Sequence, residues 1–192
     1  MTAATARRAT PRAGLVLDMR TAGQSGDGPR VAVVSDTHVP RFAKHLPCAI
    51  ERLVAQRPTH VLHCGDVTEL GALAPLIELA PFDAVAGNND GPELVERYGR
   101  RKIVEIAGTR IGLVHGDGTR GTTRDRALAA FARDAVNIIA FGHSHVPSCT
   151  RQGGLWIVNP GSPTDKRREP QYSFAMLGWS GGTCVPRLVF FS

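Results

Sequence analysis

The apolar residues of this chain fall into short uninterrupted runs. Six of these runs end abruptly in polar or glycine-rich turns, at residues 31–34, 61–62, 84–86, 111–114, 138–141 and 155–158. Runs this short, with no polar alternation, are typical of strands that are buried on both faces of a sheet. We therefore expect a strand at each of the six runs.

Between these runs, apolar residues recur at helical spacing. One helical pattern runs from Pro47 through Val54, a second from Glu69 through Ile77, and a third covers residues 124–134. Because strand and helix alternate, the pattern predicts the α/β class. From Leu155 to the end the pattern is mostly that of strands, so we expect the chain to finish in antiparallel β-structure.

The first 29 residues lack this regularity. They are rich in Ala, Arg, Thr and Gly, and residues 23–29 contain three glycines and a proline, as linkers do. We expect a disordered extension over residues 1–29 and a single domain over residues 30–192. The alternative for the extension is an additional edge strand at residues 15–17, where Leu and Val have strand propensity.

Composition places few further limits on the chain. A length of 192 residues with 42% hydrophobic and 21% charged residues is ordinary for one globular domain. There is neither an eighteen-residue apolar run nor an apolar segment behind the basic N-terminus, so we expect a cytoplasmic protein without a membrane partner. The four cysteines, Cys48, Cys64, Cys149 and Cys184, have no CxxC spacing, which agrees with free thiols in a reducing compartment.

The formal charge of +6 is weak evidence for a nucleic-acid partner. Residues 1–30 contain five arginines against Asp18 and Asp27, so half of the excess lies in the extension. Over the remainder, 18 basic residues are nearly balanced by 15 acidic ones. Nucleic-acid binding is therefore not indicated as the main role.

Almost every residue with candidate chemistry follows directly after one of the apolar runs. These residues are Asp36, His38, Asp66, Asn88, His115, His143 and His145. In open α/β sheets the carboxyl ends of the strands form one crevice, so five separate turns would bring these side chains together. Successive turns are separated by 22 to 30 residues, which is enough for one strand–helix or strand–hairpin unit.

The seven side chains supply two carboxylates, one amide oxygen and four imidazoles. That is too many ligands for one tetrahedral zinc ion and suits two divalent metal ions. Nitrogen and oxygen donors without thiolate favour manganese, iron, zinc, cobalt or nickel, and affinity order does not choose among them. We take manganese as the expected metal. Asp66, midway in the series, is the candidate bridging ligand.

No single turn would support this interpretation. A histidine after a strand is usually structural, and an aspartate there is often a helix N-cap. The segment Gly87-Asn88-Asn89-Asp90 alone is a good turn sequence. The prediction depends on the coincidence of suitable residues at the same end of five strands.

In this order, Asp-x-His, Gly-Asp, Gly-Asn-x-Asp, His-Gly and Gly-His-x-His resemble the calcineurin-like metallophosphoesterases. Within that superfamily, residues 35–43, the following Leu46-Pro47, and the segment Asn159-Pro160-Gly161-Ser162 are similar to the small bacterial and archaeal phosphodiesterases. The resemblance covers residues 31–190. It implies an αββα sandwich of two mixed β-sheets flanked by helices, with the metal site at the carboxyl ends of the strands.

The resemblance also implies how the ligands are shared between the metals. Asp36, His38, Asp66 and His145 would hold the first ion, and Asp66, Asn88, His115 and His143 the second. The implied reaction is in-line attack on phosphorus by a metal-bridging hydroxide. The substrate would be a small-molecule or nucleotide-type phosphodiester.

One departure from the family pattern concerns the substrate. Asn89 occupies a position where many members carry a histidine, and an amide can donate a hydrogen bond but cannot act as a general acid. We therefore expect diesters to be preferred over monoesters. Asp66 and Asn89 are the candidate catalytic residues, and Asn89, Arg41 and Arg168 are the candidate substrate contacts. For the run Lys166-Arg167-Arg168, the alternative is a solvated loop.

Three other functions remain as alternatives or are set aside. A phosphomonoesterase is one alternative, and a non-enzymatic scaffold is another, since a retromer subunit with this fold works as an interaction platform. A scaffold need not keep metal ligands, whereas all seven positions are filled here. A β-lactamase-like hydrolase would show His-x-His-x-Asp-His, but Val146-Pro147 follow His145. The pattern makes no prediction of oligomeric state.

Overall fold

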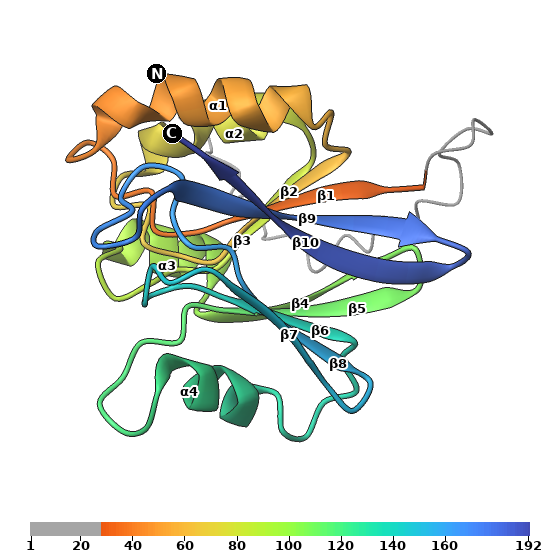
Figure 1. Cartoon of the computed structure of the whole chain (residues 1–192). Helices are drawn as coiled ribbons and strands as arrows, with labels where there is room; N and C mark the ends of the chain where they lie inside the picture. Colours follow the sequence, from red (N-terminus) through yellow and green to blue (C-terminus); the bar gives the residue numbers. More distant parts are fainter. Residues whose placement is uncertain (1–27) are drawn as a thin grey trace, which may run out of the picture.

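The computed structural model describes residues 28–192. Two five-stranded mixed sheets pack face to face, and helices cover both outer faces (Figure 1). This is the αββα sandwich expected from the sequence. Residues 1–27 of the predicted extension, with the alternative strand at 15–17, lie outside the described range. Within that range, no helix is long and apolar enough to cross a membrane.

The first sheet has the order β10-β9-β1-β2-β3. Its strands are β1 (Arg30–Val34), β2 (His60–His63), β3 (Phe82–Ala84), β9 (Tyr172–Ser180) and β10 (Thr183–Phe191). Strands β1, β2 and β3 are parallel, and β9 and β10 extend the sheet as an antiparallel pair.

The second sheet has the order β4-β5-β6-β8-β7. Its strands are β4 (Arg101–Ile106), β5 (Thr109–Val114), β6 (Ile138–Phe141), β7 (Ser148–Gln152) and β8 (Leu155–Asn159). Strands β5, β6 and β8 are parallel, and β4 and β7 form antiparallel edges.

The helices form the outer layers. The first sheet is covered by η1 (Ala43–His45), α1 (Leu46–Ala55), η2 (Leu70–Leu73), α2 (Ala74–Leu79) and α3 (Pro92–Tyr98), and the second by α4 (Thr123–Ala130) (Figure 1). A proline in the first turn begins α1, α2 and α3, where its missing N–H costs no hydrogen bond. A capping box of Thr122 and Asp125 begins α4.

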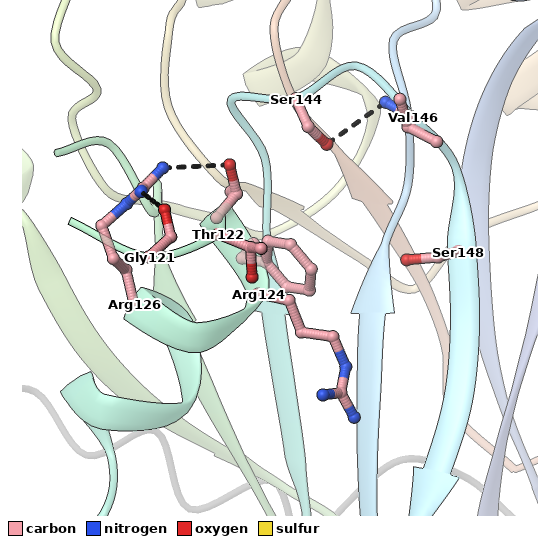
Figure 2. Close-up of a pocket in the computed structure, with 9 residues that line it drawn as sticks. Gly121, Thr122, Arg124, Arg126, Ser144, Val146 and Ser148 are labelled. Carbon is pink, nitrogen blue, oxygen red and sulfur yellow. Dashed lines mark hydrogen bonds between the residues drawn. The ribbon is translucent and has the colours of Figure 1, made fainter. Parts of the chain in front are cut away.

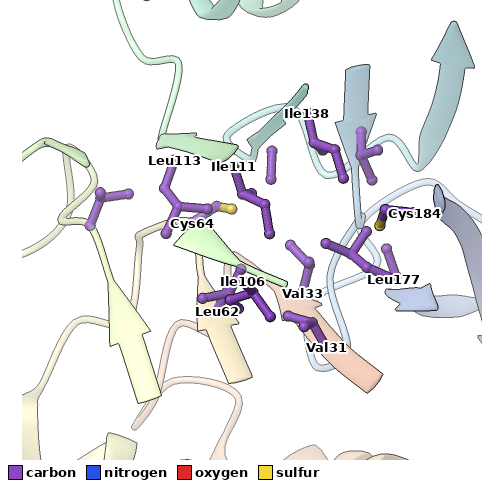
Figure 3. Close-up of a cluster of buried hydrophobic side chains, with 14 residues drawn as sticks. Val31, Val33, Leu62, Cys64, Ile106, Ile111, Leu113, Ile138, Leu177 and Cys184 are labelled. Carbon is purple, nitrogen blue, oxygen red and sulfur yellow. The ribbon is translucent and has the colours of Figure 1, made fainter. Parts of the chain in front are cut away.

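Burial on both faces explains the uninterrupted apolar runs. In β1, Val31 and Val33 point into the core between the sheets (Figure 3), whereas Ala32 and Val34 belong to the core beneath the helices of the first sheet. In β6 the same alternation sends successive side chains to the inter-sheet core and to α4. Neither face of these strands meets water, so a polar residue would have no place in them.

Some predicted boundaries were wrong. The strand expected at residues 84–86 is β3, which ends at Ala84 because its partner β2 ends at His63. The chain then leaves the sheet, and the Ala86 N–H donates to the Gly99 carbonyl. The helix expected at 124–134 ends at Ala130, where shorter-range turns follow. The chain does finish in the expected antiparallel structure, the pair β9 and β10, whereas β8 is antiparallel to β7 and parallel to β6.

Candidate metal centre

The predicted ligands meet at the edge of the sandwich where the parallel strands of both sheets end. Asp36 and His38 follow β1, Asp66 follows β2, Asn88 follows β3, His115 follows β5, and His143 and His145 follow β6. Six of these residues form two groups: Asp36 with His38 and His145, and Asp66 with His115 and His143. Within each group the donor atoms lie within 4.8 Å of one another.

The two groups adjoin each other at Asp66. Its Oδ2 lies 3.2 Å from Nε2 of His115, in its own group, and 3.7 Å from Nε2 of His38, in the other group. Asp36 Oδ1 likewise lies 3.4 Å from His145 Nε2 and 3.9 Å from His115 Nε2. The carboxylates therefore face imidazoles of both groups, as ligands of two neighbouring ions would.

The geometry of His115 fits a metal ligand. Its Nδ1 donates a hydrogen bond of 2.8 Å to the Cys64 carbonyl, which leaves the buried Nε2 without a hydrogen-bond partner among residues 28–192. That bare nitrogen faces the Asp66 carboxylate, and two acceptors in contact require a cation between them. Burial lowers the pKa of His115, but the carboxylates of Asp66 and Asp36 outweigh burial and raise it to about 9.

His145 presents the same arrangement in the other group. Its Nδ1 donates to the Asp165 carbonyl at 2.6 Å, and its Nε2 lies 3.4 Å from Asp36 Oδ1 and 3.3 Å from His38 Nε2. Burial lowers the pKa of His145 to about 4, and the ring is therefore neutral at neutral pH. Neutral imidazole is the form that binds metals, and a carbonyl acceptor on the opposite nitrogen is the usual support for such a ligand.

The two carboxyl groups have different electrostatic surroundings. Burial raises the pKa of Asp36 to about 7, against the lowering effect of His115. Burial would also raise the pKa of Asp66, but the neighbouring His115 ring and the hydrogen bonds from Asn89 hold it well below its usual range. Asp66 is therefore ionised at neutral pH, whereas Asp36 needs a nearby cation to be fully ionised.

Backbone strain is concentrated in the same turns. Nine non-glycine residues among residues 28–192 have a positive φ, and five of them are predicted ligands: Asp36, His38, Asp66, His143 and His145. A positive φ is uncommon for residues with a Cβ and costs free energy, and such outliers cluster at functional sites. The folded protein therefore holds these side chains in positions that the local chain would not choose.

Close approach between the turns requires two glycines. A Cβ on Gly87 would lie 2.2 Å from Asp66 Oδ1, and a Cβ on Gly142 would lie 1.8 Å from Ser35 Oγ. Both glycines belong to the motifs that carried the family resemblance. Their lack of a side chain lets the turns from different strands meet.

Several supporting residues had no role assigned from the sequence. The Asp90 carboxylate accepts hydrogen bonds from the backbone N–H groups of Asp66, Thr68 and Gly87, which ties two turns together. Asp90 is the last residue of the Gly-Asn-x-Asp motif, and this position could have identified it from the sequence as a residue that supports the site. The second support, Asp165, lies in a loop with no motif to identify it.

The segment Asn159–Ser162 supports the centre from the second sheet. Asn159 Nδ2 donates to the Gly142 carbonyl at 3.0 Å, and Ser162 Oγ donates to the Asp36 carbonyl at 2.8 Å. Two residues further on, Thr164 Oγ1 donates to the Thr37 carbonyl at 2.7 Å. This segment therefore fixes the turn after β1 against the turn after β6.

The remaining predicted site residues lie around the two groups. Asn89 donates its backbone N–H to Asp66 Oδ1 at 2.9 Å and its side-chain amide to Oδ2 at 2.6 Å, so its side chain is held by a candidate ligand. Asn88 is exposed and forms no hydrogen bond through its side chain within residues 28–192. Arg41 is exposed, with its guanidinium 5.2 Å from the centre of the Phe42 ring, which in turn lies edge-on to His38.

A cavity of about 430 Å³ lies beside the turn after β6 (Figure 2). Its lining includes Thr122, Arg124, Arg126, Ser144 and Ser148. The Arg126 guanidinium donates to the carbonyls of Gly116 and Gly121, both at 2.7 Å. Arg126 therefore fixes the loop that follows His115, and its hydrogen-bonding capacity is largely used by the backbone.

Comparison with known proteins agrees with this geometry. A family model described as the calcineurin-like phosphoesterase superfamily domain matches residues 30–182. A probable metallophosphoesterase of Methanothermobacter thermautotrophicus is 35% identical over 139 residues, which cover 71% of this chain and 78% of the relative.

Two solved structures share the fold. Vacuolar Protein Sorting 29 from Cryptosporidium parvum has a TM-score of 0.67 at 22% identity and covers 86% of this chain and 99% of its own. A structure described as a novel archaeal phosphodiesterase has a TM-score of 0.67 at 20% identity and covers 84% of this chain and 99% of its own. At these identities the likeness shows the fold alone.

Proposed function

This chain belongs to the calcineurin-like phosphoesterase superfamily, and from that premise we propose that it hydrolyses phosphodiesters with the help of two divalent metal ions. The observation that carries the proposal is the pair of adjoining donor groups with Asp66 facing both. Imidazole nitrogens that face carboxylates, with His115 Nε2 buried and unpartnered among residues 28–192, are an arrangement that divalent cations stabilise.

We assign Asp36, His38, Asp66 and His145 to one ion, and Asp66, Asn88, His115 and His143 to the other. When bound, such ions would lower the pKa of a water molecule between them and neutralise charge on the phosphate oxygens. Manganese is the proposed metal. The nearest thiol, on Cys64, lies in the inter-sheet core and burial raises its pKa, which leaves nitrogen and oxygen donors.

The protein groups around the ligands fix their orientation. Backbone carbonyls accept from Nδ1 of His115 and of His145, so that Nε2 of each ring faces the centre. The backbone N–H of His143 donates to the Asp36 carboxylate, and Asn89 donates twice to Asp66. Fixed orientations of this kind reduce the reorganisation that the reaction would otherwise need.

The proposed preference for diesters depends on Asn89. A monoester dianion gains most from a protonated imidazole, which neutralises charge and delivers a proton to the leaving group. At this position the chain has an amide that donates to Asp66 and cannot supply a proton. A diester carries one negative charge, so it needs the charge neutralisation of a protonated imidazole less than a monoester dianion does.

The test compares bis(p-nitrophenyl) phosphate with p-nitrophenyl phosphate, using protein reconstituted with Mn²⁺. We expect kcat/KM to be higher for the diester. Faster hydrolysis of the monoester would overturn the diester preference while leaving a phosphoesterase. Protein that binds Mn²⁺ at neither group and hydrolyses neither ester would favour the non-enzymatic scaffold instead.

A further inference from the structure

A second cavity of about 430 Å³ adjoins the first donor group. Its lining is Ser144, His145, Val146, Lys166, Arg167, Arg168 and Glu169, and we call it the cationic cavity. It shares a wall with the centre, because His145 belongs to both. The cationic cavity therefore lies directly beside the first donor group.

The loop that carries the three basic residues is fixed to the metal centre. Thr164, just before the loop, donates to the Thr37 carbonyl, and the Asp165 carbonyl accepts from His145 Nδ1 at 2.6 Å. Within the loop, the Glu169 N–H donates to the Lys166 carbonyl. These contacts fix the backbone of the loop beside the donor group, and the side chains of Arg167 and Arg168 are exposed, so the alternative of a solvated loop stays open.

The positive charges of the loop are only partly neutralised. Arg167 Nε lies 3.7 Å from Asp165 Oδ2, and Lys166 Nζ donates to the Glu169 carbonyl. Arg168 is exposed and has no ion pair within residues 28–192. The same Asp165 Oδ2 lies 3.7 Å from His145 Nδ1, so Arg167 lies close to the first donor group.

We propose that the cationic cavity binds a second phosphate group of the substrate, so that the preferred substrates are phosphodiesters carrying a further phosphate on one arm. This inference rests on the proposed function. The scissile group of a diester has one negative charge, which two divalent ions already neutralise. Lys166, Arg167 and Arg168 outnumber the acidic residues beside them, Asp165 and Glu169, so the remaining positive charge favours a further anion. A guanidinium group can donate two parallel hydrogen bonds to two oxygens of one phosphate, which favours phosphate over an anion that accepts through a single atom.

The test uses two esters that differ only in the second phosphate: thymidine 5′-(p-nitrophenyl phosphate) and the same ester phosphorylated at the 3′ oxygen. In both, a water oxygen bonds to the 5′ phosphorus, the bond from phosphorus to the aryl oxygen breaks, and p-nitrophenolate leaves. Hydrolysis of the 3′ phosphate itself releases no chromophore. The reaction rate therefore reports the same bond cleavage for both esters at constant ionic strength.

We expect the Mn²⁺-reconstituted protein to favour the 3′-phosphorylated ester by about tenfold in kcat/KM, mainly through KM. Arg168→Gln should reduce this ratio severalfold. Because Arg168 is exposed, its replacement should leave the fold intact. The matched control is Arg133→Gln, an exposed arginine that precedes β6 and so lies at the opposite edge of the sheet. It should keep the native ratio.

The outcomes separate this inference from the proposed function. Hydrolysis of both esters with a ratio near one, or a ratio that Arg168→Gln leaves unchanged, would overturn the second-phosphate site and leave the diesterase standing. Hydrolysis of neither ester would remove the proposed function and this inference with it. A raised ratio that falls in Arg168→Gln but not in Arg133→Gln supports the cationic cavity as the binding site.

Discussion

Asp66 is the candidate bridging ligand, and Asp36 also faces imidazoles of both donor groups. The Asp66 carboxylate faces imidazoles of both donor groups and accepts two hydrogen bonds from Asn89. An ionised oxygen acceptor at this position can neutralise two neighbouring cations, whereas a neutral amide of the same shape cannot. We therefore predict the effect of removing the charge of Asp66 while keeping the shape of its side chain.

Asp66→Asn should lower kcat/KM for bis(p-nitrophenyl) phosphate by about 100-fold or more, since loss of a ligand costs at least as much as loss of a supporting residue. Elemental analysis should also show fewer bound ions per chain. Asp83→Asn removes a charge that pairs with Lys102, away from the centre, and should retain native turnover. Near-native turnover in Asp66→Asn would show that this carboxylate is not shared between two ions.

Asn89→His tests the assignment of substrate class. A histidine at this position could donate a proton, so monoester kcat/KM should rise by about tenfold or more and narrow the preference for diesters. The protonated ring is the useful form, so the gain should fall as the pH rises through an imidazole pKa of about 6.5. The measurement is a pH profile of both substrate classes for the native and variant proteins.

Two results would contradict this use of Asn89. One is a native protein that already hydrolyses monoesters faster than diesters, because another residue would then supply the proton. The other is a monoester gain that is independent of pH. Asn89→Gln is a suitable control, since it keeps an amide near Asp66 and supplies no acid.

At the scale of secondary-structure elements, the centre depends on loops that are distant in sequence. Ser162 Oγ donates to the Asp36 carbonyl and accepts from the N–H groups of Thr164 and Asp165. One buried hydroxyl therefore joins the loop after β8 to the turn after β1. Removing it leaves buried polar groups without partners, which is more costly than the loss of an exposed hydrogen bond.

Ser162→Ala should lower the free energy of unfolding by about 1–3 kcal/mol, as measured by urea denaturation of the metal-free protein. Ser180→Ala, at the exposed end of β9, should change the unfolding free energy little. If the two variants are equally stable, Ser162 does not join these elements.

Only part of this level of structure could be predicted from the sequence. Strands such as β1 and β6 are buried on both faces, and that burial produced the apolar runs. The edge strands β4 and β7 were missed because few of their residues are fully buried and polar residues interrupt both, so neither has a long apolar run. The short helix α3 was also missed, since seven residues give little periodicity.

The sequence predicted the candidate ligands of the site but not the residues that hold them in place. Asp36 and the other candidate ligands follow strand ends, and strand ends were visible in the sequence. The contacts of Ser162 with Asp36 and of Asp165 with His145 join positions 126 and 20 residues apart. Such pairings depend on which turns the tertiary structure brings together, and local patterns carry no information about that.

At the scale of the whole molecule, the centre spans the two sheets. Asp36, His38 and Asp66 follow strands of the first sheet, whereas His115, His143 and His145 follow strands of the second. Each donor group takes ligands from both sheets. Bound ions would therefore connect the two halves of the sandwich, in addition to the apolar core between them.

Metal binding should consequently stabilise the entire domain. A ligand that binds only the folded state adds about 2.7 kcal/mol at a concentration of 100 times its Kd, so Tm should rise as Mn²⁺ is titrated and fall again on chelation. Elemental analysis at saturation should give two ions per chain. The double variant His115→Ala/His145→Ala removes one imidazole from each group and should abolish the Mn²⁺-dependent rise in Tm, whereas His60→Gln, outside both groups, should retain it. Saturation at one ion per chain would contradict the dimetal proposal, and an unchanged rise in the double variant would place the metal elsewhere.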